Sequence, residues 1–371
     1  MQISDIQALT TQVLWAAFLL SVIFGAIAQR THFCTMGAVS DVVNMGDWTR
    51  MRQWGMAIGV AMIGFAVLVY SGQIDPSKTL YASNRWIWLS ATVGGALFGF
   101  GMVLTSGCGS KTLIRIGGGS LKSLMVFIVM GVAAFATLKG ITAVARVDTV
   151  DQVAIDFAAG TALPNWAAAA FGIKAALAGL ILAVLLGGAL IVWALAGPDF
   201  RRPDNLLAGL GIGAVIVAMW WVSGHLGYVA EHPETLQETF LATNSGRAEA
   251  MSFVSPAAYT LDWLMFFSDK SKVLTLGIVS VFGVVVGSAA CAVAMRNFRW
   301  EGFGSTEDVA NHMSGAVLMG VGGVTALGCT VGQGLSGIST LSVTSFVAVA
   351  AILAGAVAAL KYQIWRMERT A

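Results

Sequence analysis

Two cysteines end apolar, glycine-rich runs, where a thiol and free backbone groups could contact a small polar substrate. The motifs are Gly107-Cys108-Gly109-Ser110 and Gly328-Cys329-Thr330-Val331-Gly332-Gln333-Gly334. Each glycine destabilises a helix by about 1 kcal/mol relative to alanine, so these clusters predict that a helix stops at each motif. Inside a membrane, such irregular backbone must be buried in protein or line a polar cavity.

Backbone N–H groups freed at such a break can face an anion, which the positive end of the following helix dipole also favours. The motifs add neutral side-chain donors. We therefore expect an anion passage with thiols at its narrow points, in which Cys108 and Cys329 are supported by Gly107, Gly109, Ser110, Gly328, Thr330, Gly332 and Gln333. For either motif alone, the alternative is a tight helix contact around an inert cysteine.

The other residues that could do chemistry give weaker signals. Cys34 follows the first apolar run in the polar stretch Gln29-Arg30-Thr31-His32-Phe33-Cys34, and a lone cysteine there is usually structural. Cys291 lies inside an apolar run and is expected to be a packing residue. The sequence has no HExxH spacing, no CxxC pair and no nucleotide-binding GxxxxGK[ST]. We therefore expect no metal centre and no cofactor.

The elements that carry these motifs are predicted to cross a membrane. Of the 371 residues, 57% are hydrophobic and 11% are charged, whereas about a quarter are charged in soluble domains. With 44 glycines and 6 prolines, the composition fits close helix packing in a bilayer and excludes a disordered chain. The net charge of +2 gives no basic field for nucleic acid. The predicted class is an all-α polytopic membrane protein.

A membrane-spanning helix needs about 20 mostly apolar residues, and about nine runs qualify. They cover residues 13–29, 54–72, 86–106, 121–143, 166–196, 204–223, 272–295, 313–328 and 342–364. The first is expected to be a retained span, because no cation precedes it as in a secretory signal. Short re-entrant or interfacial helices are expected in addition. Ala257–Phe267 is the candidate for an interfacial helix, with a loop packed on the bundle as the alternative.

The distribution of cations predicts the orientation. Nine spans place the termini on opposite sides, and an outside N-terminus puts 13 Lys and Arg residues inside and 7 outside. The positive-inside rule therefore predicts an outer N-terminus and a cytoplasmic C-terminus. Lys174 lies within a predicted span and is expected to reach toward an interface.

The two cysteine motifs form part of a predicted internal repeat. When Cys108 is aligned with Cys329, 221 residues later, six positions are identical: Gly94, Gly99, Gly101, Val103, Gly107 and Cys108 fall on Gly315, Gly320, Gly322, Val324, Gly328 and Cys329. A fainter echo relates residues 21–25 to 280–283. With nine spans the copies run in opposite directions, which predicts an inverted pseudo-two-fold repeat with a substrate site near the midplane.

This pattern predicts a single integral membrane transport domain over residues 1–371. Its repeat halves are expected at about 1–145 and 270–371. The spans in 166–223 and an external loop at 224–271 connect them.

Around Cys34, Cys108 and Cys329 the chain resembles the bacterial YeeE/YedE-type thiosulfate uptake proteins, which have a sulfur-transport domain. The matching segments are Arg30-Thr31-His32-Phe33-Cys34, Gly99-Phe100-Gly101-Met102 leading to Gly107-Cys108, and the motif from Gly328 to Gly334. The resemblance implies an importer of thiosulfate in the bacterial inner membrane, in which these three cysteines mark the substrate path. Some relatives work with a small cytoplasmic sulfur carrier of the TusA type, which makes such a carrier a candidate partner. Relatives are also associated with selenium metabolism.

The chemistry of thiosulfate suits three neutral thiols. The ion is a small dianion with a soft terminal sulfur, to which a protonated thiol can donate a weak hydrogen bond. Burial favours the protonated form, whereas a thiolate would repel the dianion. Weak neutral sites in series also permit release, which conduction requires. We therefore expect relay donors rather than nucleophiles.

Two alternative hypotheses assign the protein to other functional classes. A membrane thiol enzyme for sulfur transfer or redox chemistry would need a thiolate beside a cation, and Arg30 near Cys34 and Lys111 near Cys108 leave this open. A soft-metal or selenium-species transporter could also use three thiols. The transporter of a sulfur anion is the leading hypothesis.

Overall fold

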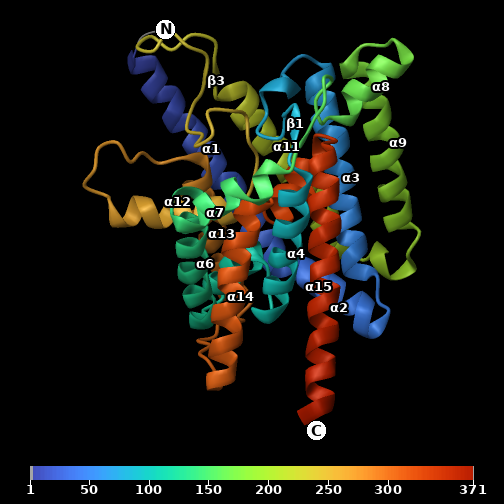
Figure 1. Cartoon of the computed structure of the whole chain (residues 1–371), viewed down its shortest axis with the longest axis vertical. Coiled ribbons are helices and arrows are strands. Elements are labelled where there is room, and N and C mark those ends of the chain that lie inside the picture. The colour runs from blue at the N-terminus through green and yellow to red at the C-terminus, as the bar shows by residue number, and fades with distance from the viewer. Residues whose placement is uncertain (1–2, 371) are drawn as a thin grey trace.

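The structure is a computed structural model that describes residues 3–370, and it is mostly helical (Figure 1). The longer helices are α1 (Ile3–Arg30), α3 (Thr49–Tyr70), α4 (Trp88–Leu104), α6 (Leu121–Lys139), α9 (Ala175–Leu195), α13 (Leu276–Ala294), α14 (Thr306–Thr325) and α15 (Val343–Thr370). The shorter helices are α2 (Thr35–Met45), α5 (Gly109–Gly117), α7 (Ile141–Asp148), α8 (Leu163–Phe171), α10 (Pro203–Leu206), α11 (Ile212–Trp221) and α12 (Val254–Met265).

Irregular helical turns and two small sheets complete the fold. The 3₁₀ turns are η1 (Pro76–Lys78), η2 (Val150–Gln152) and η3 (Pro198–Arg201), and the π-helical turns are η4 (Leu207–Gly211), η5 (Val222–Leu226) and η6 (Gly332–Gly337). The antiparallel pairs are β1 (Arg85–Trp86) with β2 (Ile155–Asp156), and β3 (Tyr228–Val229) with β4 (Thr239–Phe240). These strands lie in loops between helices.

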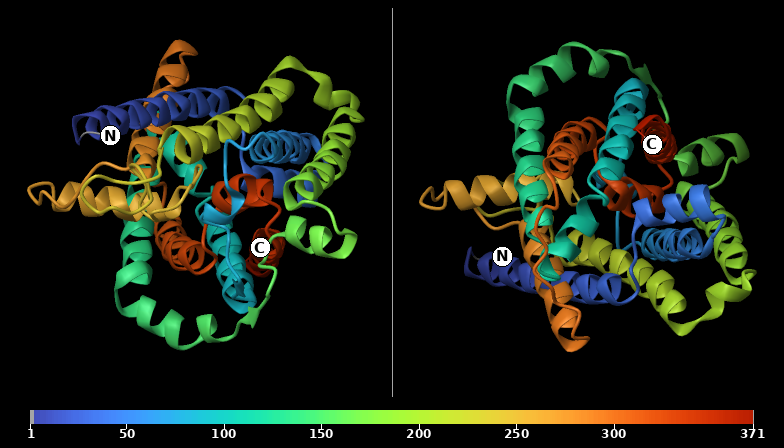
Figure 2. Two further views of the ribbon diagram at one scale, coloured as in Figure 1. Left: turned by 90° about the horizontal axis from the view of Figure 1, so that it is seen from above. Right: turned by 90° about the horizontal axis from the view of Figure 1, so that it is seen from below.

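Eight segments of the described chain are long and apolar enough to cross a membrane: Ser4–Met45, Thr49–Tyr70, Trp88–Gly117, Leu121–Lys139, Ala175–Leu195, Pro203–Leu226, Leu276–Ala294 and Val343–Arg369. Helix α9 shows why a bilayer is needed. It lies at the outside of the bundle (Figure 2), where Leu185 is 63% exposed and Val192 is 68% exposed. Its 21 residues span about 32 Å, close to the thickness of the hydrocarbon core. The predicted class, an all-α polytopic membrane protein, is confirmed.

Two predicted spans differ in detail. The run 166–196 is divided into α8 and α9, because Gly172 takes a left-handed conformation (φ 66°) and ends α8. The run 313–328 belongs to α14, which begins earlier and has Glu307 and Asp308 in its first turn. Helix α14 is therefore absent from the eight strongly apolar segments, although it packs against α4 and α6. The N-terminal end of α1 and the C-terminal end of α15 lie at opposite ends of the molecule (Figure 1).

The piece Ala257–Phe267 falls mostly within α12, which packs against α6, α13 and α14. Ala257 and Ala258 are buried against the bundle, whereas Met265 and Phe266 are exposed. The segment is therefore helical, as predicted, and one of its sides packs on the bundle.

Helices α4 and α14 cross antiparallel through glycines that occupy equivalent positions in the two copies. A Cβ built on Gly94 would lie 2.7 Å from the carbonyl oxygen of Gly322, and one built on Gly322 would lie 2.6 Å from that of Gly94. Gly101 and Gly315 make the same reciprocal approach. Each contact is turned into the other when equivalent residues of the two copies are exchanged, as a two-fold axis requires. Because the helices are antiparallel, the two copies are inverted relative to each other.

The first helices of the two copies also pack as a pair, α1 on α13. Gly25 approaches the carbonyl oxygen of Val284, and Gly287 approaches that of Val22. The reciprocal contacts make Gly25 equivalent to Gly287 and Val22 equivalent to Val284, an offset of 262 residues. The faint sequence echo predicts an offset that is three to four residues smaller. In the described chain, α2 and α3 have no counterpart between α13 and α14, where residues 295–305 form a short link.

Candidate functional site

The three cysteines singled out from the sequence lie in the protein interior. Cys108 and Cys329 are fully buried, and Cys34 is 7% exposed. The thiol of Cys34 lies close to that of Cys108, and Cys108 in turn lies close to Cys329. Cys291 lies on α13, where its thiol donates to the sulfur of Met295, the residue after the helix, at 3.5 Å. The fold therefore brings together segments that are up to 295 residues apart in the sequence.

Each of the three cysteines immediately precedes a helical turn. Cys34 caps α2, and its sulfur accepts a hydrogen bond from the Gly37 N–H at 3.4 Å. The sulfur of Cys329 accepts from the Gly332 N–H at the same distance. Cys108 has extended backbone angles before α5, and the N–H of Lys111 points to its sulfur. Three positive helix ends thus converge on three thiols.

The chain breaks in the same way before Cys108 and before Cys329. Ser106 and Leu327 are equivalent residues, and both have left-handed angles, with φ of 55° and 59°. The Gly107 N–H donates to the Met102 carbonyl at 2.8 Å, and the Gly328 N–H donates to the Gly323 carbonyl at 2.8 Å. This pairing is the Schellman ending of a helix, normally made with glycine in the left-handed position. Such strained conformations in other residues cluster at functional sites.

Hydroxyl and amide groups lie near Cys108 and Cys329. The Cys108 sulfur lies 3.2 Å from Ser110 Oγ. Thr330 Oγ1 lies beside Cys108 and has no well-aligned partner among the described residues. Gln333 donates through Nε2 to the Ala326 carbonyl at 2.7 Å, and its Oε1 is buried without a partner in the described chain. Unsatisfied buried acceptors and hydroxyls are rare in folded proteins and mark places that a ligand could occupy.

The supporting glycines allow close approach of other groups. Gly332 faces Ser252 Oγ, which would lie 2.7 Å from an added Cβ, and Gly328 faces Gln333. Gly107 faces the stem of Lys111. Gly109 has ordinary space around it, with its nearest neighbours beyond 3.6 Å from an added Cβ.

Two residues near Cys329 were not found from the sequence. Ser252, before α12, places its hydroxyl 3.9 Å from the Cys329 sulfur. Tyr81, in the loop between α3 and α4, donates its hydroxyl to the Gly332 carbonyl at 2.5 Å. Neither residue lies in a motif, so only the folded chain relates them to Cys329.

Cations also lie near the thiols. Lys111 is in electrostatic contact with Cys34 and Cys108, and Arg50 and Arg115 are close to Lys111. Arg50 Nε also pairs with Asp41 at 3.3 Å. The site thus contains charge as well as the neutral donors that the sequence predicts.

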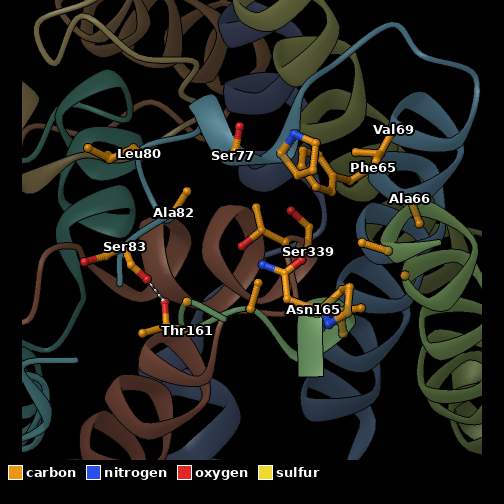
Figure 3. A pocket seen from close by; sticks show the side chains of 18 of the residues that line it. Phe65, Ala66, Val69, Ser77, Leu80, Ala82, Ser83, Thr161, Asn165 and Ser339 are labelled. Carbon is orange, nitrogen blue, oxygen red and sulfur yellow. Dashed lines mark hydrogen bonds between the residues drawn. The ribbon is translucent and has the colours of Figure 1, made fainter. Parts of the chain in front are cut away.

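Two adjoining cavities lead toward Cys329, with volumes of about 740 and 440 Å³. We call them together the vestibule. Both are lined by Leu327, beside the second helix break, and by Ser83 and Ser245. Around the larger cavity, Figure 3 shows Ser339 facing the loop that carries Ser77 and Ser83. The smaller cavity reaches Tyr81 and Gln333, so it ends at the Cys329 motif.

The charged groups of the smaller cavity are Arg85, Arg146 and Glu249. Burial raises the pKa of the Glu249 carboxyl to about 7 and also raises that of the Tyr81 phenol. Within residues 3–370, no group of three or more His, Cys, Asp or Glu residues could hold a metal ion.

Comparison with known proteins places the chain in a family. The Sulphur transport family model matches residues 30–358, which include Cys34, Cys108 and Cys329. The thiosulfate transporter TsuA of Escherichia coli (strain K12) is 26% identical over 325 residues, which cover 84% of each chain. TsuA of Spirochaeta thermophila is 25% identical over 349 residues, covering 91% of this chain and 94% of that protein. This multi-pass membrane protein belongs to the Sulphur transport family.

Proposed function

We propose that the protein imports thiosulfate, or a closely related small sulfur anion, along a path with three relay cysteines. The observation that carries the proposal is the convergence of Cys34, Cys108 and Cys329 inside the bundle, with the vestibule ending at Gln333 in the Cys329 motif. The two similar proteins named thiosulfate transporter support the choice of substrate.

In the proposed path the anion enters the vestibule, which Arg85 and Arg146 make attractive to a dianion. It then passes Cys329, Cys108 and Cys34 in turn. Each thiol donates S–H to the soft sulfur of the anion, while nearby hydroxyl and backbone N–H groups contact its oxygens. Gly107, Gly109, Ser110, Gly328, Thr330, Gly332 and Gln333 are the proposed supporting contacts.

We further propose that the whole chain, 1–371, acts as one transport unit, with halves at about 1–145 and 270–371. The vestibule then faces outward in a bacterial inner membrane, and the C-terminal end of α15 is cytoplasmic. A TusA-type carrier is the proposed acceptor on the cytoplasmic side. Uptake into proteoliposomes with and without trapped carrier tests that partner.

Uptake of labelled thiosulfate into proteoliposomes tests the central proposal, with sulfate and selenium anions as competitors. Cys34→Ala, Cys108→Ala and Cys329→Ala should each reduce uptake at least tenfold without loss of folded protein. Cys291→Ala is the matched control and should keep wild-type uptake. A folded triple variant with wild-type uptake would refute the relay.

The same preparations separate a transporter from a thiol enzyme. A relay thiol is protonated and should react slowly with alkylating reagents at neutral pH, whereas a catalytic thiolate reacts quickly. Rapid alkylation of Cys108, protected by substrate and coupled to sulfur release without net uptake, would favour the enzyme.

A further inference from the structure

An acidic side chain lies in the vestibule, where an anion is proposed to enter. Glu249 is the one acidic residue among those lining the smaller cavity in the described chain. It precedes α12 by five residues and lies close to both Tyr81 and Tyr259. Because Tyr81 is bonded to Gly332 in the Cys329 motif, Glu249 lies at the inner end of the vestibule.

The backbone holds Glu249 in place, and neutral groups contact its carboxyl. Its N–H donates to Ser223 Oγ at 2.9 Å, and Ser245 Oγ donates to its Oε2 at 3.0 Å. Among residues 3–370, no ion pair includes Glu249. An ionised carboxylate here would therefore lack a cation of its own.

The nearby arginines already have other partners. Arg247 donates to the Ala82 carbonyl at 2.8 Å. Arg85 donates to the Asp151 carbonyl at 3.0 Å, and Arg146 pairs with the Asp151 carboxylate at 3.4 Å. They attract an anion into the cavity without neutralising Glu249 directly.

A carboxylate and a dianion repel each other strongly where the protein excludes water. A protonated carboxyl has no net charge and can donate its O–H to an anion oxygen. Anion binding and protonation of Glu249 must then favour each other, because linkage is reciprocal. Burial raises the pKa of Glu249 to about 7, so both forms are populated at neutral pH.

We propose that Glu249 is a proton-binding site linked to anion binding, so that its carboxyl carries a proton whenever the vestibule holds an anion. This inference rests on the proposed transport of a sulfur anion. The proton comes from the outer solution and forms an O–H bond on the carboxyl, and no bond in the anion breaks. Thiosulfate keeps both charges throughout the neutral range, so the protein supplies the proton-binding group.

Calorimetric titration of the purified wild-type protein with thiosulfate tests the linkage without requiring transport. Titrations in buffers of different ionisation enthalpy give the protons taken up per bound anion. With a pKa of about 7, uptake should be about 0.5 proton at pH 7 and about 0.9 at pH 8. The apparent Kd should rise about tenfold per pH unit above pH 8. The Tyr81 and Tyr259 phenols do not titrate there, because burial raises both pKa values.

Glu249→Gln keeps the size and hydrogen bonding of the neutral carboxyl. It should bind thiosulfate with a Kd that is flat from pH 6 to 9 and with no proton uptake. Glu231→Gln changes an exposed acid of the same loop and should behave as wild type. A pH-independent wild-type Kd, or proton uptake that persists in Glu249→Gln, would overturn the inference while leaving thiosulfate transport intact. Absence of thiosulfate binding by the wild-type protein would instead refute the proposed function on which the inference rests.

Discussion

Gly101 and Gly315 lie face to face where α4 crosses α14, and each would bring an added Cβ within 2.7 Å of the other's carbonyl oxygen. The two residues are not aligned with each other in the repeat: Gly101 corresponds to Gly322, and Gly315 to Gly94. Their contact is therefore one half of a symmetric pair, the other half being Gly94 with Gly322. The crossing holds both cysteine motifs, because each helix ends a few residues before its cysteine.

Replacing Gly315 by alanine should destabilise this crossing. The added Cβ would meet backbone of α4, which cannot rotate away, and overpacking of this kind costs about 1–3 kcal/mol. A lower midpoint of thermal unfolding in detergent is the expected result. Gly188→Ala in α9 is the matched control, since nothing lies within 4 Å of its added Cβ, and it should not lower the midpoint. Equal midpoints for wild type and Gly315→Ala would argue against rigid packing at the crossing.

The sequence predicts the chemistry of the repeat better than its geometry. Apolar runs identify most of the long helices, and the spacing of glycines before Cys108 and Cys329 identifies α4 and α14 as equivalent. These features are local, because hydropathy and helix breaking depend on neighbouring residues. The register of α1 on α13 is set by the fit of Gly25 and Gly287 against a partner backbone. The sequence echo misses it by three to four residues.

The surroundings of the site depend on contacts between distant segments. Tyr81 reaches Gly332 across 251 residues, and Ser252 reaches Cys329 across 77. No motif marks either residue, so a single sequence cannot identify them. Lys111 is visible beside Cys108, but only the fold shows that it also lies close to Cys34.

Tyr81→Phe should loosen the turn that follows Cys329. The change removes the donor to the Gly332 carbonyl, and the loss of one hydrogen bond costs about 0.5–1.5 kcal/mol. We expect a lower unfolding midpoint and a severalfold loss of thiosulfate uptake. Tyr70→Phe, at the exposed end of α3, is the control and should change neither quantity. Wild-type uptake in Tyr81→Phe would show that this hydrogen bond does not support the path.

The stability of the protein should depend on pH through Glu249. Its pKa is about 7 in the folded protein and 4.5 in the unfolded chain, so the folded state holds the proton more tightly. This contribution is fully present below pH 4.5 and is lost as the pH rises to about 7. The loss amounts to about 3 kcal/mol. Glu249→Gln stays neutral, so its unfolding midpoint should exceed that of wild type more at pH 8 than at pH 5. An equal difference at both pH values would mean that Glu249 is ionised when folded.

Lys111→Met should separate the contribution of charge from that of the thiols. Lys111 and Gly332 are equivalent positions in the repeat, so the cation belongs to the Cys108 copy alone. An ionisable residue within a membrane segment is costly and usually functional, and this one lies where the dianion is proposed to meet Cys108 and Cys34. Methionine keeps the stem that packs on Gly107 but removes the charge.

For Lys111→Met we expect the KM for thiosulfate uptake to rise about tenfold or more, which corresponds to about 1.4 kcal/mol. Lys361→Met on the exposed face of α15 should leave KM unchanged. If Lys111→Met keeps the wild-type KM, the thiols and neutral donors alone hold the anion, as the sequence predicts.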